Sequence, residues 1–87
     1  MKDLCLKNFP EIMLMVNDEN IRQLKKWGVQ DHSPCEWVTI TSEELGETSK
    51  AILEYHFGKG TAEQVVKEAI QTATLCLKIA EMFAKEQ

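Results

Sequence analysis

Two pairs of oxygen-bearing side chains recur at helical spacing in this chain. Glu44 and Glu47 are three residues apart, and Glu68 and Gln71 repeat the same spacing further along. Residues three apart lie on one face of a helix, roughly 5–6 Å from each other at Cβ, so each pair points its polar ends the same way. If the two helices pack antiparallel, the pairs can converge. Clustered carboxylates repel unless a proton or a cation compensates them, and an oxygen-only cluster suits Mg²⁺ or Mn²⁺ better than Zn²⁺.

An alternative interpretation of these acids is that they are solvated surface residues. Glutamate is a common helix former, and a single E-x-x-E spacing is typical of an exposed helix face. The neighbourhood favours the cluster, because both pairs are embedded among small and apolar residues: Val38, Ile40, Leu45, Gly46, Ala51, Ile52, Leu53, Val65, Val66, Ala69, Ile70 and Ala73. Acids inside a buried helix stripe are costly unless they are paired or metal-bound.

Two helix-start signals place the pairs on consecutive helices. The residues S-P-C-E at 33–36 are typical of a capping box, in which side chains satisfy free backbone donors at a helix N-terminus. They predict a helix over 34–56, ended by the glycines at 58 and 60. The residues T-A-E-Q at 61–64 form a second such signal and predict a helix from 62 to about 85.

The N-terminal part of the chain has a weaker pattern. Its apolar and polar residues predict, in order, an arm over 1–9, a helix over 11–16 with a strand over 12–16 as the alternative, a turn near 17–19, a helix over 20–27 and a loop over 29–32. Gly28 is the expected C-terminal cap of the helix before it. The chain as a whole, 1–87, has the length of a single domain.

Composition excludes several classes of protein. Hydrophobic residues make up 44% and charged residues 28%, which is ordinary for a soluble globular protein. The net charge is -4 with no basic run beyond Lys25-Lys26, which argues against a nucleic-acid surface. The 3 cysteines form no zinc or disulfide framework, and no apolar stretch is long enough for a membrane span. We therefore expect a reduced, cytoplasmic protein with no membrane partner.

The last predicted helix is apolar over more than one face. One stripe consists of Val65, Ala69, Ala73, Cys76 and Ala80, and another of Leu75, Ile79, Met82 and Phe83. A single hairpin partner cannot cover both stripes, so we expect self-association into a homodimer or homotetramer. The predicted fold is all-α: a helical hairpin or bundle of about three main helices, completed by oligomerisation.

A family resemblance follows from residues before and around the first acidic pair. The chain has R-Q-L-K-K-W-G-V-Q at 22–30, H-S-P at 32–34, Trp37, and E-E-L-G-E at 43–47. Together these residues resemble the MazG-like nucleotide pyrophosphohydrolases, members of the all-α NTP pyrophosphatase superfamily. That superfamily is marked by E-E-x-x-E followed by E-x-x-D. The segment E-A-I-Q at 68–71 matches the second motif except at its end, where Gln71 stands in place of aspartate.

The resemblance implies an Mg²⁺-dependent hydrolase that splits a (d)NTP into (d)NMP and pyrophosphate and so removes canonical or non-canonical nucleotides. By motif position, Glu44, Glu47 and Glu68 are the implied metal ligands and catalytic acids. Gln71 takes the fourth ligand position, and Glu43 is an outer ligand or a base that orients water. An amide oxygen can ligate Mg²⁺ but carries no charge, so the site has one negative charge fewer than the family pattern.

Further residues have both a substrate-binding and a structural interpretation. Trp37 could stack on a base or fill the core, and His32 and Gln30 could contact a base or belong to the loop. Lys50 could reach a phosphate, but pairing with Glu47 or Glu54 on its own helix is favoured. The remaining phosphate candidates, Lys78, Arg22 and Lys25, are weaker, and solvated charge is the favoured interpretation of the last two.

Two other functions remain open. One is a catalytically reduced helical module that binds a nucleotide or a protein partner without turnover, and Gln71 supports it. The other is a structural oligomerisation domain whose acids form ion pairs, for instance Glu47 with Lys50. Melting with Mg²⁺ and nucleotide separates these possibilities, because a ligand that binds only the folded state raises the melting temperature.

Overall fold

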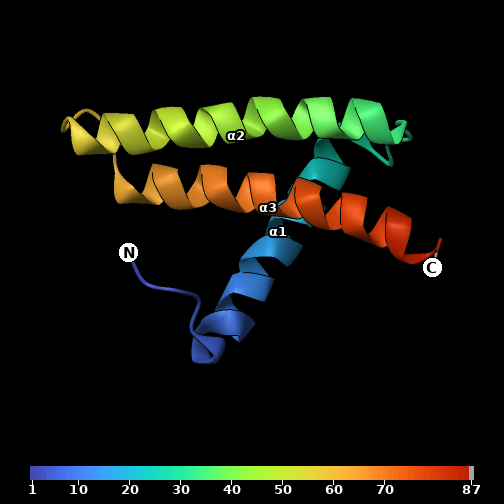
Figure 1. Cartoon of the computed structure of the whole chain (residues 1–87), viewed down its shortest axis with the longest axis horizontal. Helices are drawn as coiled ribbons and strands as arrows, with labels where there is room; N and C mark the ends of the chain where they lie inside the picture. Colours follow the sequence, from blue (N-terminus) through green and yellow to red (C-terminus); the bar gives the residue numbers. More distant parts are fainter. Residues whose placement is uncertain (87) are drawn as a thin grey trace.

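The chain is described here by a computed structural model that covers residues 1–86, and all of its regular elements are helices. Figure 1 shows their arrangement. In chain order they are a 3₁₀ turn, η1 (Leu6–Asn8), and three α-helices, α1 (Phe9–Trp27), α2 (Pro34–His56) and α3 (Ala62–Ala84). No strand occurs among the described residues, so the all-α prediction is confirmed.

The start of α2 follows the predicted capping box. The Glu36 backbone N–H donates to Ser33 Oγ at 3.2 Å, and the Ser33 N–H donates to Glu36 Oε1 at 2.9 Å. The start of α3 has only half of such a box. The Gln64 N–H donates to Thr61 Oγ1 at 3.1 Å, but the return bond to the Gln64 side chain is absent among the described residues. Both helices nevertheless begin where the sequence predicted.

The first helix differs from the prediction. α1 is continuous from Phe9 to Trp27, so the predicted turn near 17–19 and the alternative strand over 12–16 are both wrong. The polar run does not break the helix, because Glu19 finds its hydrogen-bond partners one turn further along on the same helix face. The predicted cap is confirmed: Gly28 has φ 69° and donates its N–H to the Leu24 carbonyl at 2.8 Å.

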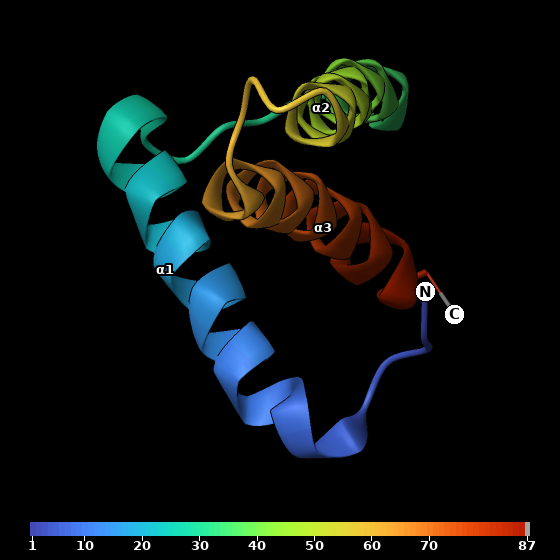
Figure 2. The same cartoon turned by 90° about the vertical axis from the view of Figure 1, so that its left-hand side faces the viewer.

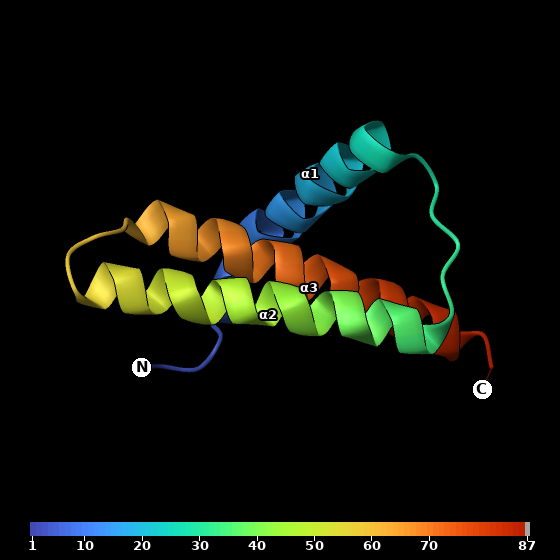
Figure 3. The same cartoon turned by 90° about the horizontal axis from the view of Figure 1, so that it is seen from above.

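α3 is the central helix of the fold. α2 runs antiparallel beside it, as Figures 1 and 3 show, and α1 crosses α3 on another side, as seen in Figure 2. Among the described residues α1 packs on α3 but not directly on α2. Three helix faces therefore meet only where the C-terminal part of α1 approaches the hairpin. None of the helices formed by residues 1–86 has the length and apolar character that crossing a bilayer requires.

The interior of the fold is small and unusually polar. Its buried apolar side chains are Trp37, Ala51 and Leu75, and its buried polar ones are Glu19, Gln23, Thr41, Thr48 and Thr74. Each threonine hydroxyl donates to the carbonyl four residues earlier, at 2.8–3.1 Å, which removes the cost of burying it. Buried threonine lets the two helices of the hairpin approach closely, and it leaves Glu19 and Gln23 as the groups that need a further explanation.

Candidate functional site

A hydroxyl contact between α2 and α3 sets the register of the two acidic segments. The hydroxyls of Thr48 and Thr72 lie 3.1 Å apart across the hairpin. Each hydroxyl also bonds back one turn, Thr48 to the carbonyl of Glu44 at 3.1 Å and Thr72 to the carbonyl of Glu68 at 3.0 Å. This contact fixes the register of the antiparallel helices α2 and α3. Glu44 and Glu68 each lie one turn before the threonine of their own helix, so they lie on the facing sides of the two helices. The convergence predicted from the spacing thus occurs for Glu44, Glu68 and Gln71, whereas Glu47, the other member of the first pair, lies on the exposed flank.

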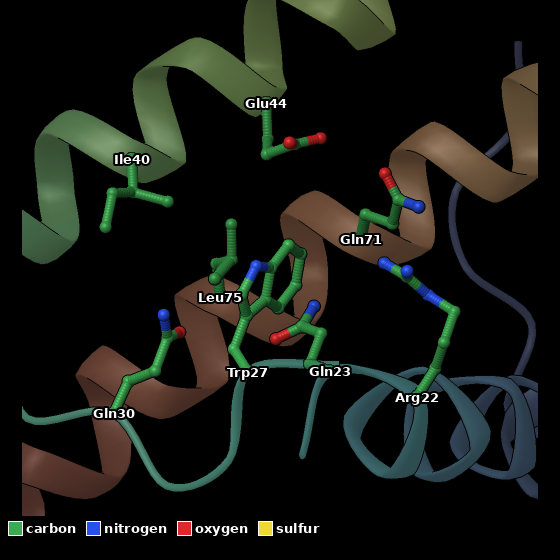
Figure 4. A pocket seen from close by; sticks show the side chains of 8 residues that line it. All are labelled: Arg22, Gln23, Trp27, Gln30, Ile40, Glu44, Gln71 and Leu75. Atoms are coloured by element: carbon green, nitrogen blue, oxygen red, sulfur yellow. The ribbon is translucent and has the colours of Figure 1, made fainter. Parts of the chain in front are cut away.

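The amide of Gln71 joins the two carboxylates. With its nitrogen turned toward them, it donates to Glu68 Oε2 at 3.0 Å and to Glu44 Oε2 at 3.1 Å. Figure 4 draws the opposite orientation, in which the amide oxygen faces the carboxylates and finds no donor. The nitrogen-inward orientation gives the amide two hydrogen-bond acceptors, whereas the drawn orientation leaves its oxygen facing acceptors only. Two carboxylates and one amide therefore form the centre of the site.

Repulsion between neighbouring carboxylates destabilises the ionised form of Glu44. Burial, followed by the nearby carboxylates of Glu68 and Glu47, raises the pKa of Glu44 above its ordinary value. A hydrogen bond between the Glu44 and Glu68 carboxyls acts in the same direction, because it favours the protonated acid. The site thus holds more negative charge than its own side chains neutralise, which is the condition that a cation relieves.

An ion pair between the buried Glu19 and the partly exposed Arg22 lies on α1. Arg22 donates from Nε and Nη2 to the two carboxylate oxygens of Glu19, both at 2.8 Å, and Gln23 Nε2 donates to Glu19 Oε2 at 2.7 Å. Burial alone would raise the pKa of Glu19, but the hydrogen bonds from Arg22 and Gln23 outweigh it and hold that pKa below its ordinary value. The bidentate bond fixes the direction of the guanidinium.

The Arg22 guanidinium and Glu44 share a pocket of about 160 Å³ between the three α-helices, whereas Glu68 borders a different depression. In Figure 4 the Arg22 side chain reaches from α1 toward Gln71, with Glu44 above it on α2. The lining residues are Arg22, Gln23, Trp27, Gln30, Ile40, Glu44, Gln71 and Leu75. Trp27 is half exposed, at 50%, so one aromatic ring stands open beside the polar centre. We call this the acidic pocket.

A wider pocket of about 580 Å³ adjoins it and shares Gln23 and Gln30 as lining residues. There the Lys78 ammonium donates to Gln23 Oε1 and lies 5.5 Å from the centroid of the Trp37 ring. Burial lowers the pKa of Lys78 despite the opposing field of Glu19. His32 meets Trp37 edge to face at 5.0 Å, and its Nε2 is buried without a hydrogen-bond partner among the described residues. We call this the loop pocket.

The remaining predicted residues lie outside both pockets. Glu47 and Lys50 are exposed and line a shallow depression that Glu68 also borders. Neither of the ion pairs favoured from the sequence, Lys50 with Glu47 or with Glu54, occurs within residues 1–86. The exposed helix flank leaves these side chains to water, where such pairs contribute little. Glu43 is exposed and lines none of the pockets described here.

The motifs imply a cation at this centre, and the available donors are few. Within residues 1–86 no three carboxylate, imidazole or thiol side chains gather into a group that could hold a metal ion. Glu44 and Glu68 do gather, and the third group is the Gln71 amide. Mg²⁺ in proteins is often held by one or two carboxylates, with water and substrate phosphate oxygens completing its shell. The set of two carboxylates and one amide oxygen fits that requirement.

Sequence reasoning found one part of the site and missed another. Glu44, Glu68 and Gln71 were predicted together and lie together. Glu19 and Gln23 were not singled out, although both are buried. Arg22, for which a solvated charge was the favoured interpretation, is 44% exposed and joins them in one hydrogen-bonded network. Their i, i+3 and i+4 spacing was the available signal. Trp27 was also missed as a pocket residue, while Trp37, at 6% exposure, is a core side chain whose ring edge borders the loop pocket.

Comparison of the chain with family models, with curated proteins and with solved structures gave no match in any of the three.

Proposed function

We propose that this protein is an Mg²⁺-dependent nucleoside triphosphate pyrophosphohydrolase that converts a (d)NTP and water into (d)NMP and pyrophosphate. The observation that carries the proposal is the meeting of Glu44 and Glu68 from facing helices, with Gln71 between them and Arg22 opposite. A triphosphate needs positioning and charge neutralisation more than covalent chemistry for this reaction. An acidic centre that faces a fixed cation supplies partners for both a metal and a phosphate.

Glu44, Glu68 and the Gln71 amide oxygen are the proposed Mg²⁺ ligands. Glu47, which the motif also implies, is exposed and forms no three-acid group with them among residues 1–86. Mn²⁺ is an expected substitute, because it accepts the same oxygen donors. When bound, the cation neutralises phosphate charge and polarises both the phosphoryl group and the attacking water. Glu43, the outer ligand or base implied by the resemblance, is exposed and lines none of the pockets, so no role is proposed for it.

We infer that the Gln71 amide serves the site in two orientations. Without a cation, its nitrogen donates to both carboxylates and holds them together. With a cation, the opposite amide orientation presents an oxygen to the same point, which is the orientation drawn in Figure 4. The price of the second arrangement is the loss of two hydrogen bonds. A glutamine therefore preserves the centre in its metal-free form, where an aspartate would add a third repelling charge.

Arg22 is the proposed phosphate contact. Its guanidinium is held by Glu19 and lines the acidic pocket beside Gln71, so it is directed before any ligand arrives. Arginine matches the paired oxygens of a phosphate group, and a preset direction reduces the entropy lost on binding. Glu19 is thus a positioning residue for Arg22. Lys78, on the far side of Gln23, provides a second cation at the edge of the loop pocket.

Two places are available for the base. Trp27 offers an open ring in the acidic pocket, whereas the loop pocket offers His32, with an unpartnered buried nitrogen, and the edge of Trp37. Gln30 lines both pockets and can reach a base edge in either of them. Because Trp27 lies beside the metal ligands and is half exposed, we assign stacking to Trp27 and edge contacts to Gln30 and His32.

Product analysis tests the proposed reaction. The protein is incubated with a panel of canonical and modified (d)NTPs and Mg²⁺, and the products are separated by ion-exchange chromatography. Monophosphate and pyrophosphate in equal amounts are expected, and their loss is expected with EDTA and with the substitution Glu68→Gln. Diphosphate and inorganic phosphate as products, or turnover that survives Glu68→Gln, would contradict the assignment.

Substitution of Arg22 by glutamine is expected to raise KM by about 10- to 100-fold with a smaller effect on kcat, because a charge-assisted hydrogen bond contributes about 1.5–3 kcal/mol. Glu19→Gln keeps the cation but loses its bidentate anchor, so an intermediate rise is expected. Lys25→Gln is the matched control, since Lys25 is an exposed cation of the same helix. Equal effects of the Arg22 and Lys25 substitutions on KM would refute a specific role for Arg22.

One observation favours a second candidate, a module that binds a nucleotide or a protein partner without turnover. Gln71 already satisfies both carboxylates, so the centre is stable as an oxygen and nitrogen cluster without a metal. Melting experiments separate the two functions. A shift with nucleotide and Mg²⁺ but no pyrophosphate release would favour the binding module. The ion-pair scaffold has less support, because no ion pair of Glu44, Glu47 or Glu68 occurs among residues 1–86.

A further inference from the structure

Lys78 is a cation in the loop pocket that has no anionic partner. Its ammonium donates to the amide oxygen of Gln23 and lies 5.5 Å from the centroid of the Trp37 ring. Neither of the ion pairs formed within residues 1–86 includes Lys78. An ammonium carries three donors, and the Gln23 oxygen is the one acceptor that Lys78 has among the described residues. The other donors can therefore serve a ligand.

Gln23 fixes the position of this ammonium. Gln23 is buried, and its Nε2 donates to Glu19 Oε2 at 2.7 Å. Because the amide nitrogen faces a carboxylate, the amide oxygen faces the other way, toward Lys78. Turning the amide over would place its oxygen against Glu19 and its nitrogen against the ammonium, so both hydrogen bonds would be lost. Lys78 is thus held in place before a ligand arrives, which reduces the entropy lost on binding.

The inner end of the loop pocket combines this ammonium with an aromatic wall. Lys78 and His32 are both half-buried, and both lie against the ring of the buried Trp37. The acids that line the same pocket are exposed to solvent, where water weakens their field; they are Asp31, Glu81 and Glu86. A ligand that enters the pocket therefore meets a hydrogen-bond donor with a full positive charge at its inner end.

From this arrangement we propose that Lys78 selects nucleotides whose base presents a carbonyl oxygen in place of an amino group. The inference rests on the proposed function, which assigns the edge contacts of the base to Gln30 and His32, and these residues line the loop pocket together with Lys78. An ammonium donates hydrogen bonds and accepts none. It therefore binds the carbonyl oxygen of thymine, uracil or guanine and disfavours the amino group of cytosine or adenine.

The selectivity bears directly on non-canonical nucleotides. Deamination replaces the amino group of cytosine by the carbonyl oxygen of uracil, and the amino group of adenine by the carbonyl oxygen of hypoxanthine. The two members of each pair have nearly the same size, so the shape of a pocket separates them poorly, whereas a donor with a fixed position separates them well. Lys78 thus favours the deaminated nucleotides dUTP and dITP over dCTP and dATP.

Competition between the two members of each pair tests the selectivity. The wild-type kcat/KM is expected to be about 10- to 100-fold higher for dUTP than for dCTP, and for dITP than for dATP, because one hydrogen bond to a charged group is gained. Lys78→Met keeps the apolar stem without the donor, so both preferences should disappear. Lys59→Met removes an exposed cation outside the loop pocket and should leave them unchanged. A wild type without preference would overturn the proposal. Equal losses on all four nucleotides in Lys78→Met would also overturn it, because Lys78 would then contact a phosphate.

Binding of monophosphates separates this inference from the proposed reaction. dUMP and dCMP carry the same difference in the base but no phosphate–phosphate bond to hydrolyse. Quenching of tryptophan fluorescence measures their affinities, since Trp27 and Trp37 line the two pockets. Wild type is expected to bind dUMP at least about tenfold more tightly than dCMP, and Lys78→Met is expected to bind both equally. Such a preference without turnover of any triphosphate would support the selectivity and refute the reaction. Turnover with equal affinities, or with no binding of either monophosphate, would support the reaction and overturn the selectivity.

Discussion

Replacing Glu44 with glutamine is expected to have opposite effects on stability and on activity. In the metal-free protein the carboxylate is destabilised by burial and by the charges of Glu68 and Glu47, which together raise its pKa. Glutamine removes the charge while keeping the volume. A gain on the order of 1 kcal/mol, the scale of one partly screened charge interaction, raises the melting temperature by about 4–8 °C in a domain of this size.

The activity of the same variant should fall by at least about 100-fold, the upper range for loss of one supporting group at a metal site. Calorimetry in EDTA and initial-rate measurements in Mg²⁺ give the two results from one preparation. Glu63→Gln is the control, since it removes the same charge from an exposed position at the start of α3. If both variants gain equal stability, the cause is the net charge of -4 and not the acidic pocket.

The stabilising effect of Glu44→Gln should also depend on pH, with a sign fixed by the raised pKa. A carboxyl that binds its proton more tightly in the folded state penalises folding only when it is ionised. The penalty is therefore absent well below the unfolded-state pKa of 4.5, develops as the pH rises through the folded-state pKa, and is complete at neutral pH. The melting difference between wild type and variant should shrink on acidification. A difference that grows instead would mean that Glu44 is stabilised as an anion.

The helices and the acidic centre could be predicted because their signals are local. Capping residues at 33–36 and 61–64 mark helix starts. The spacing of Glu44 with Glu47 and of Glu68 with Gln71 predicts one shared face on each helix, and of these four residues only Glu47 lies apart from the centre. Such signals need only neighbours within one turn. An antiparallel arrangement of the two helices is the one further assumption that brings these faces together.

The network on α1 could not be predicted because its energetics depend on contacts from another helix. Asn17, Asp18 and Glu19 read as a polar interruption, since the sequence does not say that Glu19 would be buried beside Lys78 of α3. Once buried, a carboxylate must be paired, and Arg22 and Gln23 then become obligatory partners. The exposure of the two tryptophans also depends on packing and not on sequence spacing: Trp27 is half exposed, whereas Trp37 is buried.

The substitution Gln71→Asp is expected to make the stability of the protein depend on Mg²⁺. It removes the amide that donates to Glu44 and Glu68 and brings a third carboxylate to the same point. The metal-free variant should lose about 2 kcal/mol, the cost of leaving buried acceptors without a donor. A cation at 100 times its dissociation constant returns about 2.7 kcal/mol. The variant should therefore melt below wild type in EDTA and near or above it in Mg²⁺.

This reversal separates the two roles that Gln71 could have. If the amide oxygen is a metal ligand, aspartate is a stronger one, and Mg²⁺ affinity and turnover rise together in the variant. If Gln71 only holds the acids together in a binding module, the variant loses stability in EDTA and Mg²⁺ restores none of it. Asn17→Asp adds the same charge at an exposed position of α1 and should change neither quantity. The melting temperatures of wild type and variant are measured at several Mg²⁺ concentrations without any substrate. The metal site is therefore tested independently of the reaction.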